Sequence, residues 1–199
     1  MQSMNVPKRF SSLTLIFPCL ALLALSTSAN AAPSFGSAID QSQPVIDSTV
    51  GGLAIGGNST QKLAQTVTVG LAGRLAGMYL PIDCESGRLV IQIRDLNGNE
   101  PGDVVLTQRR IRAARLGAVG PVFRFFRIGG GLSFAAGDRF ALVLTNPRGT
   151  CAIFQGPLGD SYAGGEGFFD ALPNPAGWVP FSDTETRLDL PMMTVMQLP

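Results

Sequence analysis

Aromatic and acidic side chains gather in one stretch of the 199-residue chain, the glycine- and proline-rich segment 156–183. Tyr162, Trp178 and Phe181 supply the aromatic rings, and Asp160 supplies a carboxylate beside them. Aromatic faces stack on the apolar faces of sugars, and a nearby carboxylate accepts hydrogen bonds from sugar hydroxyls. These four residues therefore predict a saccharide-binding platform. The competing interpretation, which we favour, is structural: Trp178 would close the end of a domain and Tyr162 would pin a loop.

Four carboxylates from the same part of the chain form the one arrangement that could support hydrolysis. Glu166 with Glu185, or Asp170 with Asp183, would act as a pair if the late loops folded over a common cleft. Glycosidases use two carboxylates in this way. Acidic side chains in loops are usually solvated, however, and nothing in the spacing requires either pair to meet. We therefore expect no catalysis at these residues.

Alternating oxygen ligands at Asp95, Asn97 and Asn99 resemble the start of a calcium-binding loop. Such a loop needs a bidentate glutamate at its twelfth position, where this chain has Leu106. The Asn97-Gly98 step instead favours a hairpin turn, because an Asn-Gly pair adopts the positive φ angles that tight hairpins need. No cofactor is predicted from this segment. Two other acidic residues leave calcium binding elsewhere in the domain open, namely Asp138 and Asp160.

Four arginines fall close together at Arg109, Arg110, Arg112 and Arg115. Guanidinium groups form two parallel hydrogen bonds to anionic groups, so this cluster is a candidate site for an anionic polymer or a lipid headgroup. The alternative, which we favour, is an exposed strand edge or loop. Its charge would then keep the protein in solution and deter pairing with strands of other molecules.

The residue types that are missing exclude several kinds of chemistry. The chain contains no histidine, so imidazole bases, Ser-His-Asp and Cys-His nucleophiles, and histidine-ligated zinc or copper are excluded. The glycine runs at 129–131 and 164–165 lack the lysine and the strand-to-helix context of a phosphate-binding loop. We interpret them as turns, and we expect the protein not to be an enzyme.

The first 31 residues have the three parts of a secretory signal peptide. Lys8 and Arg9 form a basic start, residues 13–25 form a short apolar run, and small residues at 29–31 precede Ala32. A membrane-spanning helix needs about 20 apolar residues, and this run is shorter. We therefore expect cleavage between Ala31 and Ala32, a secreted or periplasmic protein, and no membrane span after cleavage.

Cleavage would change both the cysteine count and the charge. Cys19 would leave with the signal peptide, and Cys84 and Cys151 would remain as a pair. In an oxidising compartment such a pair is expected to form a disulfide, which would stabilise the fold by about 4 kcal/mol because it closes a long loop. The 15 basic residues would fall to 13 with the loss of Lys8 and Arg9, against 14 acidic residues. This near-neutral balance argues against a dedicated nucleic-acid-binding protein.

Beyond residue 60 the chain alternates short apolar runs with turn residues. Leu89, Ile91 and Ile93 would share one face of a strand, while Gln92 and Arg94 would point the other way. This period of two is typical of a strand buried on one side. Further strands are predicted over 63–71, 75–82, 104–108, 122–128, 139–145, 151–155 and 187–196. The turn spacing, with 24 Gly and 14 Pro, predicts an all-β fold: an antiparallel β-sandwich of jelly-roll type with about eight strands.

This strand pattern also divides the chain. Residues 1–31 are predicted as the signal peptide, 32–60 as a flexible leader and 61–199 as the sandwich domain. Within the domain, 107–116 is the one segment that could make a helical turn. The residues predicted to face the core in the strands at 139–145 and 187–196 are Phe140, Leu142, Leu144, Leu188, Leu190, Met192 and Met196.

Two groups of segments carry a resemblance to a known family. The first group is 64–68, 73–80 and 89–95, with Pro101-Gly102 and Val105-Leu106, and the second is 132–144, 162–165 and Gly177-Trp178. Over about residues 60–196 they resemble the jelly-roll modules of many secreted bacterial proteins, which are similar to carbohydrate-binding and galactose-binding-like β-sandwiches. Because these motifs are turns and core positions, the resemblance implies the fold more than the ligand. The final strand departs from the pattern, since residues 191–193 replace the Phe-Arg-Thr-like run expected there.

These observations lead to three hypotheses about function. The first is a secreted, non-catalytic β-sandwich that binds a glycan, such as a polysaccharide, or another extracellular or envelope component. The second is a structural or assembly protein of the cell envelope, whose exposed strands meet a protein partner and which has no small ligand. The third is a carboxylate-based glycosidase or lyase. A nucleic-acid partner is not expected.

Overall fold

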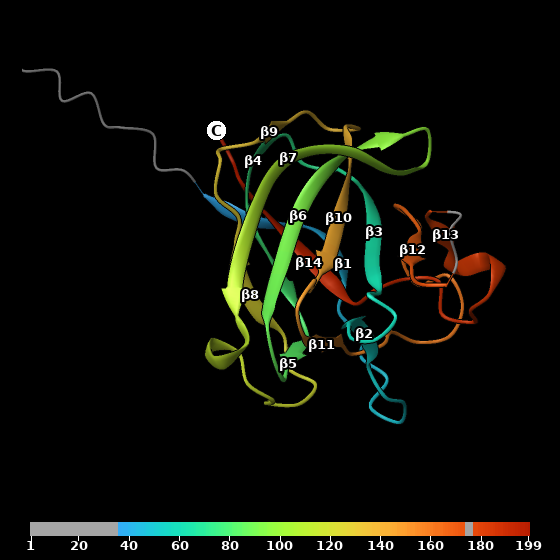
Figure 1. The fold of residues 1–199 in the computed structure, drawn as a ribbon. Helices are drawn as coiled ribbons and strands as arrows, with labels where there is room; N and C mark the ends of the chain where they lie inside the picture. Colours follow the sequence, from blue (N-terminus) through green and yellow to red (C-terminus); the bar gives the residue numbers. More distant parts are fainter. Residues whose placement is uncertain (1–35, 174–176) are drawn as a thin grey trace, which may run out of the picture. The chain divides into compact units, whose positions relative to one another are not determined.

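The computed structural model describes residues 36–173 and 177–199, and within these ranges the chain is all-β (Figure 1). The predicted signal peptide and its cleavage site between Ala31 and Ala32 lie outside the described residues. Neighbouring strands within the sheets pair antiparallel. No helix in the described ranges is long and apolar enough to cross a membrane.

The strands form three sheets. The five-stranded sheet has the spatial order β1 (Ser37–Gln43), β14 (Met192–Gln197), β4 (Gly73–Leu80) and β8 (Arg124–Arg127), and β9 (Ser133–Phe134) also pairs with β4. The six-stranded sheet has the order β13 (Val179–Pro180), β12 (Gly167–Asp170), β3 (Lys62–Thr68), β10 (Arg139–Thr145), β6 (Arg88–Asn97) and β7 (Glu100–Arg112). The small sheet joins β2 (Leu53–Gly56), β11 (Thr150–Ile153) and β5 (Ile82–Cys84).

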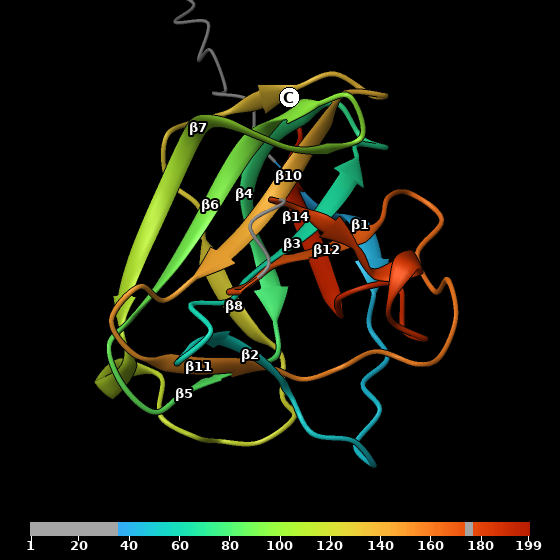
Figure 2. The ribbon, with the colours of Figure 1, turned by 45° about the vertical axis from the view of Figure 1, so that its right-hand side comes forward.

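Figure 2 shows the two large sheets packed face to face. A cluster of buried apolar side chains joins them. The residues predicted to point inward from β6 and β10 are all buried, namely Leu89, Ile91, Ile93, Phe140, Leu142 and Leu144. Leu75, Met78 and Met196 meet them from the opposite sheet in one core cluster. Each fully buried side chain of this size stabilises the fold by roughly 1.5–3 kcal/mol. The predicted β-sandwich with alternating strands is therefore confirmed.

The small sheet lies at one end of the sandwich and contains the disulfide (Figures 1 and 2). Cys84 in β5 and Cys151 in β11 are directly opposite one another in the antiparallel register. Their sulfurs are 2.00 Å apart, and both residues are buried. The predicted disulfide is confirmed, and it ties two strands that lie far apart in the sequence.

The sandwich begins earlier in the chain than the sequence predicts. Residues 37–43 and 53–56, assigned above to a flexible leader, form β1 and β2 and pair with β14 and β11. The Asp40 side chain also accepts hydrogen bonds from the backbone N–H groups of Gly70 (2.9 Å) and Leu71 (2.6 Å). The leader prediction was wrong here because β1 is an edge strand with few apolar residues, so its sequence lacks the period of two.

The segment predicted as a helical turn is mostly extended. Residues 107–112 belong to β7, and only one 3₁₀ turn, η1 (Ala113–Arg115), follows. At the end of the chain, β14 lies between β1 and β4, with Met192 and Met196 buried as predicted. The described residues contain more strands than the eight expected, because several loops contribute strands of only two to four residues.

Candidate functional site

The four residues predicted as a saccharide platform do not form one exposed surface. Tyr162 and Phe181 are buried in the core between the sheets, at 6% and 1% exposed. Trp178 packs on the outer face of the six-stranded sheet, the side turned away from the five-stranded sheet, beside Phe168. Asp160 is exposed in the loop before Tyr162. Trp178 and Phe181 therefore lie on opposite sides of one sheet, and the three rings cannot present a common face.

A buried carboxylate explains the position of Tyr162. The side chain of Asp189 accepts hydrogen bonds from the backbone N–H groups of Ser161 (2.8 Å) and Tyr162 (2.9 Å) and from the amide of Gln65 (3.0 Å). The Tyr162 hydroxyl donates to the side-chain oxygen of Gln41 at 3.1 Å. Burial raises the pKa of Asp189 above its ordinary value and raises the pKa of Tyr162 to about 12. The structure thus supports the structural interpretation, in which Tyr162 pins a loop.

The carboxylates proposed for hydrolysis are partly engaged with neighbouring residues. Asp170 forms an ion pair with Lys62 at 2.7 Å. The side chain of Glu166 accepts a hydrogen bond from the Ser182 hydroxyl. Asp183 lies in the 3₁₀ turn η2 (Phe181–Asp183), and Glu185 follows that turn. Asp170 therefore lies at the end of β12, and Glu166 lies directly before this strand. Asp183 and Glu185 lie after β13.

The oxygen atoms suggested as calcium ligands take part in turns. Asp95 accepts a hydrogen bond from the Val104 backbone N–H at 3.0 Å, and Asn99 accepts one from the Arg139 guanidinium at 3.0 Å. Asn97 pairs with Glu100 across the β6–β7 hairpin, in which Gly98 has φ +65°. The predicted hairpin is present. Asp138 accepts a hydrogen bond from the Ala135 backbone N–H, and across 36–173 and 177–199 no three His, Cys, Asp or Glu side chains group as metal ligands.

A positively charged groove lies on the outer face of the six-stranded sheet. We call it the arginine groove, and its volume is about 670 Å³. It is lined by Gly87, Arg88, Val90, Gln92, Gln108, Arg110, Thr145, Asn146, Pro147 and Arg148. A second hollow of about 230 Å³ adjoins it and is lined by Arg88, Arg110, Arg112 and Arg115. The five arginines of the two hollows are called the groove arginines below.

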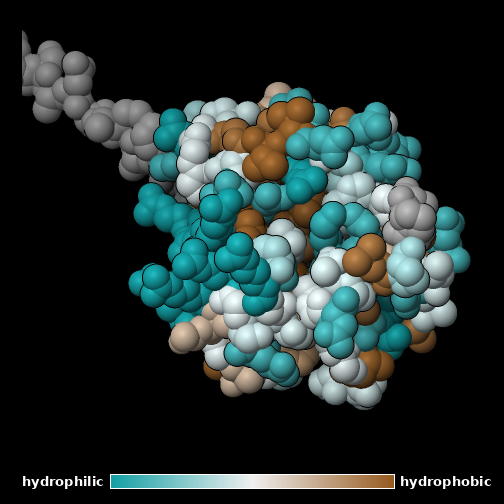
Figure 3. Space-filling view, viewed as in Figure 1, coloured by the Kyte–Doolittle hydropathy of each residue, from teal (hydrophilic) through white to brown (hydrophobic). Residues whose placement is uncertain are grey.

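Strand register explains why these side chains gather on one face. In the β6–β7 ladder Arg88 is opposite Arg112, and Val90 is opposite Arg110. Residues two apart on a strand point to the same side, and the intervening Leu89 and Ile111 are buried in the core. Arg88, Arg110 and Arg112 therefore point outward together. The β10–β11 turn adds Arg148. In Figure 3 hydrophilic side chains (teal) gather at the left of this face, over the lower part of β7, and a hydrophobic patch (brown) lies above them.

The groove arginines lack acidic partners in the part of the chain that the structure describes. The two ion pairs found there join Lys62 to Asp170 and Arg187 to Asp47. Glu85 lines a neighbouring hollow with Arg88 and Arg112 but forms no ion pair with them. Five positive charges therefore share one surface, and none of them is joined to a carboxylate by an ion pair among the described residues.

The predicted arginine cluster is divided by the structure. Arg110, Arg112 and Arg115 line the hollow that adjoins the groove. The Arg109 guanidinium instead donates to the backbone oxygen of Arg127 on β8 at 2.6 Å. Sequence reasoning missed Arg88 and Arg148, which join the cluster through strand pairing. The position of β7 at the edge of its sheet agrees with the edge-strand interpretation of these arginines. That interpretation does not account for the groove that they line.

The outer face of the five-stranded sheet has the opposite character. Five apolar side chains on this face, some exposed and some half-buried, form what we call the apolar row: Phe125, Tyr79, Met193, Val195 and Ile39. Phe125 is 45% exposed and Ile39 54% exposed, and the Tyr79 and Phe125 ring centroids are 5.1 Å apart. Gly77 leaves room for the Phe125 ring, because a Cβ atom there would lie 2.7 Å from the ring carbon Cζ.

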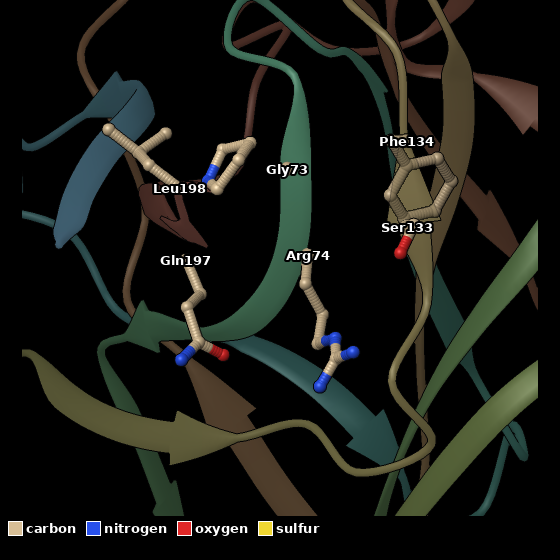
Figure 4. Close-up of a pocket in the computed structure, with 7 residues that line it drawn as sticks. Gly73, Arg74, Ser133, Phe134, Gln197 and Leu198 are labelled. Carbon is tan, nitrogen blue, oxygen red and sulfur yellow. The ribbon is translucent and has the colours of Figure 1, made fainter. Parts of the chain in front are cut away.

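A smaller hollow of about 280 Å³ lies further along β4. In Figure 4 the side chains of Arg74 and Gln197 extend in the same direction from neighbouring strands, with Ser133 and Phe134 to one side. The hollow therefore offers one positive charge and one amide. It is far less charged than the arginine groove.

No protein-family model, no curated protein and no solved structure matches this chain. The β-sandwich is established by its own geometry, and the carbohydrate-binding function implied by the resemblance stays a prediction.

Proposed function

We propose that this chain is a non-catalytic β-sandwich module that binds a glycan or another extracellular or envelope component in the arginine groove. The observation that carries the proposal is a groove of about 670 Å³ lined by three arginines, with two more arginines in the adjoining hollow of about 230 Å³. None of the five forms an ion pair among the described residues. This volume falls in the range of ligand-binding pockets, which is about 300–1,000 Å³.

The groove contains a local conflict that a purely structural surface would avoid. Like charges directly opposite one another on neighbouring strands are destabilising, and Arg88 is directly opposite Arg112. Residues that weaken the local structure, and that no other contact within the protein compensates, are expected at functional sites. A bound anion would offset the repulsion, since guanidinium groups form two parallel hydrogen bonds to carboxylate, sulfate or phosphate.

The lining of the groove supports binding without catalysis. Its polar side chains are arginines, amides and one hydroxyl, from Gln92, Gln108, Asn146 and Thr145. An arginine stays protonated in proteins and an amide does not titrate near neutral pH. Neither can exchange a proton with a substrate as a general acid or base must.

An extracellular or periplasmic location is the third part of the proposal. The signal-peptide pattern of residues 1–31 predicts export. The Cys84–Cys151 disulfide is compatible with that prediction, because disulfides persist in oxidising compartments. Polysaccharides and other envelope polymers are the abundant ligands in these compartments.

Filling the groove tests the proposal. Val90 forms part of its floor, so Val90→Trp would occupy the ligand's space, while Val45→Trp adds the same ring at an exposed loop position outside the groove. Binding of the full, oxidised chain to a panel of polysaccharides would be measured for both variants. We expect Val90→Trp to lose about tenfold or more in affinity, about 1.4 kcal/mol, with the melting temperature unchanged. Arg110→Ala provides a second test if Val90→Trp misfolds, and equal binding by all variants would refute the site.

A second candidate function rests on the opposite face. The apolar row is a partly exposed group of apolar side chains on a sheet, and such patches often mark protein–protein contacts. It favours the hypothesis of an envelope assembly protein with a protein partner. A photo-crosslinker placed at Phe125 in the native host, compared with one at Gln108 in the groove, separates the two functions. Crosslinks to one protein from Phe125 alone would favour the second candidate.

A further inference from the structure

We infer that the ligand of the arginine groove is an acidic polysaccharide, a chain of sugars with repeated carboxylate or sulfate groups that crosses β6 and β7. This inference rests on the proposed function, because it names the class of ligand for the same site. It is carried by the arrangement of the two hollows and by the kinds of side chain that line them.

The two hollows form consecutive positions for anionic groups. Arg88 and Arg110 line both of them. Of the two hollows, Arg148, from the β10–β11 turn, lines only the arginine groove. Arg112, from the end of β7, and Arg115, from η1, line the second hollow and not the groove. A small anion would neutralise the charges of one hollow only. A ligand with anionic groups in succession would neutralise both, with the shared arginines between them.

The groove is held in shape before a ligand arrives. The Asn146 side chain accepts a hydrogen bond from the Arg88 backbone N–H at 3.1 Å and donates one to the Ser86 oxygen at 2.8 Å. This fixes the turn that carries Arg148 against the start of β6. The side-chain oxygen of Gln92 accepts two hydrogen bonds from the Arg94 guanidinium, at 2.8 and 2.6 Å. Thr145 and Gln108 are then the neutral polar side chains best placed to hydrogen-bond sugar hydroxyls.

The lining favours a polysaccharide over other anionic macromolecules. Proteins that hold single-stranded nucleic acid combine positive charge with aromatic rings on which the bases stack. No aromatic side chain lines either hollow. Attachment to an anionic membrane needs apolar side chains that insert beside the basic residues, and Val90 on the groove floor is 7% exposed. Sugars need only hydroxyl and anion contacts of the kind present here.

Binding measurements on the full, oxidised chain test this inference. The probes are polygalacturonate as the carboxylated chain, heparin as the sulfated chain and dextran as the neutral chain, with single-stranded DNA and phosphatidylglycerol vesicles as the competing classes. Arg88→Gln removes a shared arginine, Arg148→Gln and Arg115→Gln each remove one from a single hollow, and Arg127→Gln removes the same charge from the other sheet's outer face.

We expect an acidic polysaccharide to bind more tightly than the other classes and its affinity to fall steeply with salt, because the contacts are ionic. Arg88→Gln should weaken binding about tenfold or more, and the single-hollow variants about three- to tenfold, since each removes charge-assisted hydrogen bonds. Arg127→Gln should change affinity less than about twofold, as expected for an exposed charge away from the ligand. An oligosaccharide long enough to reach both hollows should bind more tightly than its monosaccharide.

The outcomes separate the inference from the function on which it rests. Tighter binding to DNA or to the vesicles would overturn the inference. Binding to dextran that is insensitive to salt but lost in Val90→Trp would also overturn it and leave the proposed function standing. If no polysaccharide of any kind binds, the proposed function itself fails.

Discussion

The two outer faces of this sandwich are built by the same alternation of side chains and carry opposite chemistry. Around the groove on the six-stranded sheet, the outward positions of β6 and β7 are arginines and amides beside Val90. On the five-stranded sheet, aromatic and aliphatic side chains of β4, β8 and β14 form a row on the outer face, with Arg127 beside it. The core between the sheets is mainly apolar, and its buried polar side chains include Gln65, Asp189 and Thr194. The period of two therefore determines which residues are buried, and the residue types at the alternate positions determine what each face can bind.

The two outer faces also differ in shape and in charge. The arginine groove is concave and its charges have no ion pair in the described ranges, which suits a flexible anionic chain. The apolar row is an array of side chains across neighbouring strands, and such an array suits another folded surface. If both faces bind partners, the module would link a polymer to a protein.

Loss of the disulfide should have the largest effect and should affect one face more than the other. Cys84 lies directly before the 85–88 segment that lines the hollows near the groove, and Asn146 donates to the Cys151 sulfur at 3.2 Å. Replacing both cysteines by serine should lower the free energy of unfolding by about 2–5 kcal/mol. Hydrogen exchange should accelerate most at residues 84–88 and 146–151, and polyanion binding should weaken. Equal acceleration in β4 and β14 would contradict the link between the disulfide and the groove.

Gly77→Ala should damage the apolar row and spare the groove. A Cβ atom at Gly77 would meet the backbone oxygen of Phe126 and the ring of Phe125. Because a backbone oxygen cannot move aside without shifting β8, we expect a loss of about 1–3 kcal/mol in the free energy of unfolding. Chemical denaturation measures this loss, and polysaccharide binding by the folded fraction should be unchanged. Gly98→Ala is no suitable control, since its φ of +65° adds strain, whereas Gly129→Ala meets nothing within 4 Å.

The elements that the sequence predicted well are those with local signals. Leu89, Ile91 and Ile93 alternate within one strand, so their burial could be predicted without knowing the partner strand. Asn97-Gly98 has the chemistry of a hairpin turn, and the hairpin is present. The disulfide could be predicted from the number of cysteines that remain after signal-peptide cleavage and from the oxidising compartment expected for an exported protein. In each case the information lies within a few residues or in the residue type itself.

The candidate site could not be predicted in the same way because strand pairing assembles it. Arg148 is far in sequence from Arg110, and only the β3–β10–β6–β7 order places the two beside one groove. The same limit explains why residues 37–43 were assigned to a flexible leader, since β1 is recognised only through its pairing with β14. The direction of the Tyr162 and Phe181 side chains could not be predicted either, because an aromatic residue in a glycine-rich loop can fold back into the core, and composition does not give its direction.

Arg112→Gln should raise stability slightly, which distinguishes a binding surface from a structural one. The substitution removes the repulsion with Arg88, directly opposite on β6, and like-charge pairs across strands cost about 0.2–1 kcal/mol. Thermal melts at low salt should show the increase, and salt should reduce it by screening. The matched variant Arg187→Gln removes an arginine that is paired with Asp47 at 2.6 Å, and it should lower stability instead. Destabilisation by Arg112→Gln without ligand would indicate an internal partner for this charge.

The ion pair between Arg187 and Asp47 should also affect the stability of the protein in acid. The groove arginines should not affect it. Hydrogen bonds from Thr49 and from the Arg187 guanidinium lower the pKa of Asp47 from 3.8 to about 2. Because the folded state favours the charged carboxylate, its stabilising contribution is present above pH 3.8 and is lost as the pH falls toward about 2. Melting temperatures measured between about pH 5 and about pH 2 should fall less steeply in Asp47→Asn than in the wild type. Arg110→Gln should keep the wild-type slope, and a flatter slope in that variant would show that a carboxylate, rather than an external anion, balances the groove.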